Sequence, residues 1–120
     1  MKHTYRLETD AGAVVAEHVE LADGMVSRFL GLMFRADLPD GHGLVLRPCN
    51  SIHMFFMRFP LDVLFVDGDG KVLRVLDSIK PWRASTLVRG SKGAIELRAG
   101  TAARTGVSPG TVVRMVEAGG

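Results

Sequence analysis

Hydrophobic and polar residues alternate along two early stretches of the chain, and this pattern predicts a pair of β-strands. The alternation runs over residues 4–9 and 13–20, and Asp10, Ala11 and Gly12 between them favour a turn. Period-two alternation places apolar side chains on one face of a strand and polar side chains on the other. We therefore predict a β-hairpin in this part of the chain.

Residues 23–33 carry a different spacing, which predicts a short α-helix. The apolar residues of this stretch recur at helical spacings: Met25, Phe29, Leu32 and Met33. Asp23 is a suitable residue to cap the helix at its amino end. Proline and glycines in residues 35–43 then indicate a loop.

The middle of the chain predicts a second hairpin. Residues 61–66 are almost continuously apolar, which is typical of a strand that is covered on both faces. Residues 67–70 alternate aspartate and glycine and favour a tight turn into a strand over 71–79. Further short elements are expected as strands at 44–47, 93–97 and 111–117 and as one helical turn at 100–104.

Together these elements predict a mainly β fold with one short α-helix near residues 23–33. Short strands at intervals of about ten residues are typical of an antiparallel β-sandwich or a partly open barrel. The chain has 120 residues, of which 47% are hydrophobic and 23% are charged, and this suits one domain over residues 1–120.

Composition narrows the setting in which we expect the protein to work. Cys49 is the single cysteine, so no disulfide forms within the chain, and a lone thiol favours a reducing compartment. No apolar run approaches the ~18 residues of a membrane span, and the amino-terminal residues lack the apolar run of an export signal. We therefore expect a cytoplasmic protein with no membrane partner. The formal net charge is +2 with the cations scattered along the sequence, which does not favour a nucleic-acid partner.

Ionisable residues within apolar segments are the main candidates for a site. His53 lies in the apolar stretch 52–57, which we interpret as a strand, and Asp62 lies in the next strand. A buried polar group without a hydrogen bond costs about 1–3 kcal/mol, so each of these side chains needs a partner. We expect Asp62 to pair with His53, and Arg28 on the predicted helix is the second candidate. Such a cluster predicts a polar pocket, with a structural ion network as the alternative.

Three further residues join the candidate set. Trp82 lies between Lys80 and Arg83 in irregular sequence, where it would cover the pocket, stack on a planar ligand or anchor the loop to the core. Glu96 lies in the predicted strand 93–97. Cys49 precedes His53 by four residues, and the two meet only if the chain turns between them. The remaining histidines lie in unrelated segments, so we predict no metal site, and no motif indicates a cofactor.

In its motifs the chain resembles the family called domain of unknown function 192, or uncharacterised protein family 0127. The resemblance covers nearly the whole sequence and is specific in the combination of its parts. Its carriers are Arg28, Gly31, Leu32, Met33, Arg35, Ile52, His53, Met54, Phe55, Phe56, Met57, Pro60, Leu61, Asp62, Phe65, Asp67, Pro81, Glu96, Leu97, Gly100, Gly106 and Gly110. Members often have an aspartate after the last of these glycines, where this chain has Thr111. The resemblance implies a compact β-rich fold with a short helix and assigns no activity.

Three functions are consistent with the sequence. The first is a binding module for a small polar or anionic ligand, with Arg28, His53 and Asp62 in the pocket and Cys49, Trp82 and Glu96 as further candidates. The second is an enzyme that uses Cys49 as a nucleophile with His53 as its base, or His53 and Asp62 as an acid–base pair. The third is a module that binds nucleic acid or protein through Lys80, Trp82 and Arg83. The sequence leaves the ligand and the oligomeric state open.

Overall fold

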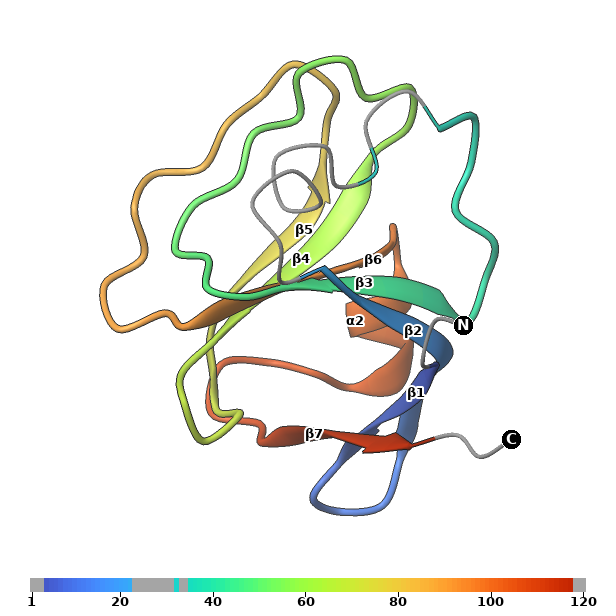
Figure 1. Cartoon of the computed structure of the whole chain (residues 1–120), viewed down its shortest axis with the longest axis vertical. Coiled ribbons are helices and arrows are strands. Elements are labelled where there is room, and N and C mark those ends of the chain that lie inside the picture. Colours follow the sequence, from blue (N-terminus) through green and yellow to red (C-terminus); the bar gives the residue numbers. More distant parts are fainter. Residues whose placement is uncertain (1–3, 23–31, 33–34, 118–120) are drawn as a thin grey trace.

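Seven strands form one strongly curved sheet. The computed structural model describes residues 4–22, 32 and 35–117. The strands are β1 (Tyr5–Thr9), β2 (Val14–Ala22), β3 (His42–Leu46), β4 (Leu61–Val66), β5 (Val72–Ile79), β6 (Gly93–Arg98) and β7 (Val113–Glu117), and one short helix, α2 (Thr101–Thr105), lies between β6 and β7. The order across the sheet is β5-β4-β6-β3-β2-β1-β7, so β5 and β7 are its two edges (Figure 1).

The two edge strands meet at one end only, which makes the sheet a half-barrel. Lys71, before β5, forms an antiparallel bridge with Val112, before β7. At Gly70 the backbone has φ +85°, and a Cβ atom there would lie 2.2 Å from the carbonyl oxygen of Val113. Only glycine therefore allows this close approach. The prediction of a mainly β, partly open barrel is confirmed, and the sandwich alternative does not form.

One strand pair departs from the antiparallel expectation. Strands β2 and β3 are parallel, whereas all other pairs in the sheet are antiparallel. A parallel pair needs a long crossover, and residues 23–41 supply it. The helix predicted near residues 23–33 lies almost entirely outside the described residues. The helical turn predicted at 100–104 is confirmed as α2.

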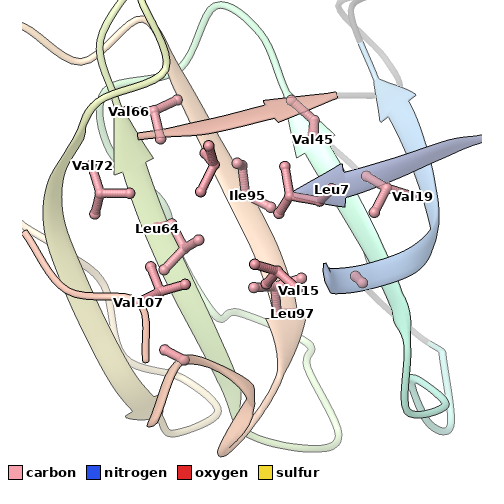
Figure 2. Close-up of a cluster of buried hydrophobic side chains, with 13 residues drawn as sticks. Leu7, Val15, Val19, Val45, Leu64, Val66, Val72, Ile95, Leu97 and Val107 are labelled. Carbon is pink, nitrogen blue, oxygen red and sulfur yellow. The ribbon is translucent and has the colours of Figure 1, made fainter. Parts of the chain in front are cut away.

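An inner core fills the concave side of the sheet (Figure 2). It takes side chains from both edge strands of the sheet, including Val72 on β5 and Val113 on β7. Its buried members are Leu7, Val15, Ala16, Val19, Val45, Leu64, Val66, Val72, Ile95, Leu97, Ala102, Val107 and Val113.

An outer core covers the opposite face of the same strands. Its buried members are Ala22, Leu32, Leu38, Leu44, Leu46, Ile52, Met54, Met57, Leu61, Val63, Phe65, Val88 and Ala94. Several of these come from the loops before β4 and after β5, so the loops pack against the sheet. All six residues of β4 are buried because this strand lies between the two cores, as its continuous apolar run predicts.

The two loops that cover the outer core pair with each other in a loop ribbon of residues 50–54 and 83–88. The Met54 amide donates to the Arg83 carbonyl at 2.6 Å, and the Val88 amide donates to the Asn50 carbonyl at 2.7 Å. His53 and Ala84 form an isolated antiparallel bridge between these bonds. The interpretation of residues 52–57 as a strand is wrong, because the chain turns back after Met54.

Candidate functional site

Asp62 is fully buried on β4 and holds three backbone segments together. Its Oδ1 accepts the amide of Ser78 at 2.8 Å, in an irregular part of β5. Its Oδ2 accepts the amides of Gly100 at 3.1 Å and Ala102 at 2.9 Å, at the amino end of α2. The carboxylate therefore supplies the acceptor that the first amides of this helix lack within the helix itself.

The expected pairing of Asp62 with His53 does not form, because the two residues face opposite sides of the sheet. Neighbouring residues of a strand alternate between faces. Since Leu61 and Val63 belong to the outer core, Asp62 points to the inner side, where Ala102 lies. Ile52 and Met54 on either side of His53 are members of the outer core. Asp62 is thus a structural residue and is not part of a pocket with His53.

His53 and Cys49 each hydrogen-bond to a nearby backbone group. The Phe55 amide donates to Nδ1 of His53 at 3.3 Å. The Cys49 thiol donates to the Ser51 carbonyl at 3.0 Å. These contacts assign neither residue a catalytic role. Arg28, the third member of the expected pocket, lies outside the described residues.

Glu96 is the buried acid whose hydrogen bonding is incomplete. It lies on β6 between Leu44 of β3 and Val63 of β4, so its side chain enters the outer core. Only 5% of the residue is exposed, and its Oε1 accepts no hydrogen bond within the described part of the chain. Burial raises the pKa of this carboxyl to about 7, and the positive charge of Arg35 opposes the shift. Glu96 is therefore about half protonated near neutral pH, where an ordinary glutamate is ionised.

Trp82 belongs to an aromatic tip, formed by His53, Phe55, Phe56 and Trp82. The ring centroids lie 4.9 Å apart for His53 and Phe55, 6.1 Å for Phe55 and Trp82, and 4.9 Å for Phe56 and Trp82. Trp82 is 59% exposed, so it does not anchor its loop in the core. The tip therefore consists of three exposed rings and the half-buried ring of His53, of which the sequence predicted a site only at Trp82 and His53.

Two tight turns build the aromatic tip and share one acceptor. The first turn is closed by the Met57 amide, which donates to the Met54 carbonyl at 3.2 Å, and the second by the Arg83 amide, which donates to the Lys80 carbonyl at 3.3 Å. The Met54 carbonyl also accepts the Trp82 amide at 2.7 Å, which joins the two turns. Phe56 and Trp82 each occupy the third position of their turn with φ +63° and +69°, where type II turns favour glycine. Strain of this kind persists only where surrounding contacts impose it, and it is common at binding sites.

The turn strain predicts an unusual order of stability at position 82. Trp82→Gly is expected to be about 1 kcal/mol more stable than Trp82→Ala, because both remove the ring but only glycine adopts a positive φ without strain. Urea unfolding of the two variants measures the difference. At Leu87, which is also exposed and has no positive φ, the alanine variant should be at least as stable as the glycine variant. An alanine variant that is the more stable one at position 82 would contradict this account of the turn.

A cleft lies at the end of the half-barrel. Its volume is about 320 Å³, and we call it the barrel mouth. The floor is apolar and consists of Leu7, Val45, Val66, Ile95, Val113 and Met115. Since most of these residues belong to the inner core, the mouth opens directly onto it.

The rim of the barrel mouth is polar and has more positive than negative side chains. Its charged residues are Arg47, Asp67, Asp69, Lys92 and Arg114. Asp67 already accepts the amides of Asp69 and Lys71 at 2.9 Å each, so this carboxylate stabilises the turn. Arg114 lies 3.9 Å from Glu8. A Cβ on Gly93 would lie 3.1 Å from Cγ of Arg47, so the glycine leaves space for the arginine stem.

Sequence reasoning missed the barrel mouth because its rim comes from separate segments. Arg47 follows β3, Lys92 precedes β6 and Arg114 lies on β7. No local spacing relates these cations. The alternating aspartates and glycines at 67–70 were the one signal at this position, and they were correctly interpreted as a turn.

Comparisons with known proteins find a matching family model and several similar proteins. The family model DUF192, described as "Uncharacterized ACR", matches residues 6–115. The chain belongs to the DUF192 family. Among curated DUF192 relatives, a UPF0127 protein of Pyrococcus furiosus is 36% identical over 104 residues, covering 75% of this chain and 85% of that protein. A UPF0127 protein of Thermococcus gammatolerans is 37% identical over 93 residues, covering 71% of this chain, which spans only 58% of that relative's length.

Two solved structures share the half-barrel. A protein of unknown function from Novosphingobium aromaticivorans has a TM-score of 0.80 and 27% identity, covering 92% of this chain and 83% of that one. A protein from Sinorhizobium meliloti, described as a candidate transcription regulator, has a TM-score of 0.81 and 30% identity, covering 96% and 94% of the two chains. The DUF192 fold described above is therefore also observed in these relatives.

Metal-binding clusters and membrane-spanning helices are both absent from the described residues of this DUF192 chain. No group of three or more His, Cys, Asp or Glu side chains in that part of the chain is arranged to hold a metal ion. No described helix is both long enough and apolar enough to cross a membrane.

Proposed function

We propose that this protein binds a small amphipathic anion, which is a molecule with an apolar body and one carboxylate or phosphate group, in the barrel mouth. The observation that carries this proposal is the combination of a cleft of about 320 Å³ with an apolar floor and a rim that bears Arg47, Lys92 and Arg114. Clefts of ~300–1,000 Å³ with apolar walls and a few polar groups are typical small-molecule sites, and the mouths of β-barrels are frequent locations for them.

The floor supports an apolar body for the ligand. Leu7, Val66 and Ile95 are nearly fully buried members of the inner core, yet they also line the cleft. Because these three side chains are already almost fully buried, they give the ligand an apolar wall to pack against. The half-buried Met115 is the floor residue whose apolar surface a ligand would remove from water, at about 25 cal/mol per Å².

The rim supports an anionic group on the ligand. Arg47 and Lys92 are exposed and form no ion pair within the described residues. Arg114 is near Glu8, but 3.9 Å is long for a charge-assisted hydrogen bond. Because Asp67 is occupied by backbone amides, the cations of the rim are the groups available to a carboxylate or phosphate.

Isothermal titration calorimetry with sodium octanoate tests the proposal. We expect saturable binding to the wild type, and we expect Arg47→Gln/Lys92→Gln to bind about five-fold or more weakly, because charge-assisted hydrogen bonds are lost. Arg83→Gln is the matched control, since Arg83 is exposed but lies outside the mouth. Octan-1-ol should bind the wild type more weakly than octanoate does. Equal octanoate binding by the double variant and the control would refute the proposed site.

A further inference from the structure

The loops that form the aromatic tip and the loop ribbon carry four exposed cations, of which Lys80 and Arg83 flank Trp82 in the sequence. Residues 50–60 and 80–91, which form the loop ribbon and both strained turns, contain four of the 15 Lys and Arg residues and none of the 13 Asp and Glu residues of the chain. The four cations are Arg58, Lys80, Arg83 and Arg89, and all are exposed. None forms an ion pair within the described residues. These two loop segments therefore carry four positive and no negative side chains, whereas the rest of the chain has more acids than bases.

Rings and cations together suit a linear polyanion with unpaired aromatic bases. From these contacts we infer that the aromatic tip and the loop ribbon bind single-stranded nucleic acid, at a site separate from the barrel mouth. Unpaired bases stack on exposed aromatic rings, and the phosphates between them attract Lys and Arg side chains. A duplex offers its phosphates but keeps its bases paired, so it makes only part of these contacts.

The distribution of exposed apolar and positive side chains along the ribbon favours single-stranded nucleic acid over a lipid surface as the ligand. Trp82 precedes the paired residues of the ribbon at one end, whereas the 67% exposed Leu87 and the Arg89 cation lie at its other end. Phe55, Phe56 and Trp82 gather at the tip, but Leu87 and Arg89 lie at the other end of the ribbon, so the exposed apolar and charged groups extend along its length, as contacts with an extended nucleic-acid chain require. A single-stranded nucleic acid that lies along the ribbon would meet cations at both ends of the ribbon and aromatic rings at the end that carries the tip.

Fluorescence anisotropy with a labelled 15-nucleotide oligodeoxythymidylate tests the inference. We expect the wild type to bind with an affinity that falls steeply as salt rises, because phosphate contacts release counterions. Trp82→Gly should bind about ten-fold more weakly with an unchanged salt slope, since it removes a stacking ring. Arg83→Gln should lower the salt slope by about 0.7, the value for one phosphate contact on a single strand. Glycine suits the positive φ at position 82, so the first variant is expected to fold.

Matched controls separate this site from general surface effects. Val14→Ala removes an exposed apolar side chain on β2, and Lys71→Gln removes an exposed cation, both outside the ribbon and the tip. Both should bind the oligonucleotide as the wild type does. Absence of binding, equal affinity for a 15-base-pair duplex, or full affinity of Trp82→Gly would overturn the inference. Sedimentation with phosphatidylcholine–phosphatidylserine vesicles but no oligonucleotide binding would assign the surface to membranes and also overturn it. None of these outcomes depends on octanoate binding at the barrel mouth.

Discussion

Replacing Asp62 by alanine is expected to lower the free energy of unfolding by about 4 kcal/mol. The carboxylate accepts the amides of Ser78, Gly100 and Ala102, and a buried donor left without a partner costs about 1–3 kcal/mol. The variant also leaves a cavity beside α2, because Asp62 is fully buried. Denaturation in urea, followed by circular dichroism, measures the loss.

Two variants control for the nature of the change at Asp62. Asp62→Asn keeps one carbonyl oxygen in place and should lose about half as much stability as the alanine variant, because part of the acceptor set remains. Asp69→Ala removes an exposed carboxylate from the turn after β4 and should change stability by less than about 0.5 kcal/mol. A loss below about 1 kcal/mol in Asp62→Ala would show that the three amides find other acceptors.

Replacing Glu96 by glutamine is expected to stabilise the protein at pH 8 by about 3 kcal/mol and to have little effect at pH 4. The folded protein holds the Glu96 proton up to a pKa of about 7, whereas the usual value for the group is 4.5. Between these values the folded state binds more protons than the unfolded state, so stability contributed by the protonated acid is complete below about 4.5 and is lost as the pH rises to about 7. Glutamine is neutral throughout and avoids the loss.

The difference in the free energy of unfolding between the wild type and Glu96→Gln reports on this one group, because all other titrating groups are the same in both proteins. Urea unfolding of both proteins at pH 4, 6 and 8 should give a difference that grows with pH. Glu17→Gln, on the exposed side of β2, should show no such growth. A Glu96→Gln difference in the free energy of unfolding that is the same at pH 4 and pH 8 would mean that folding does not raise the pKa of Glu96, and it would contradict the prediction.

The backbone of the fold could be predicted well from local pattern. Period-two alternation located β1 and β2, and the apolar run at 61–66 located the strand that lies between two cores. These signals work because each strand faces the core with a regular set of side chains. The apolar run at 52–57 was wrongly interpreted as a strand because its apolar residues are also buried. Met54 and Met57 are buried from a turn, and burial alone does not distinguish a turn from a strand.

The candidate site was less predictable because its parts meet only in three dimensions. A need for partners was correctly expected for Asp62, but the partners are amides 16 to 40 residues away, and an amide has no sequence signature. Lys80 and Arg83 flank Trp82 in the sequence, but Arg58 comes from the other loop, and only the pairing of the two loops relates it to them. The buried position of Glu96 follows from its strand, whereas its missing hydrogen bond does not.

Chemical-shift mapping of uniformly ¹⁵N-labelled protein during titration with octanoate tests ligand binding at the barrel mouth most directly. The account predicts the largest shifts for the backbone amides of Val66, Gly68 and Gly93, which line the cleft, and small shifts for Phe55 and Trp82 at the aromatic tip. Saturation without shifts around the cleft, or with the largest shifts at the aromatic tip, would contradict it.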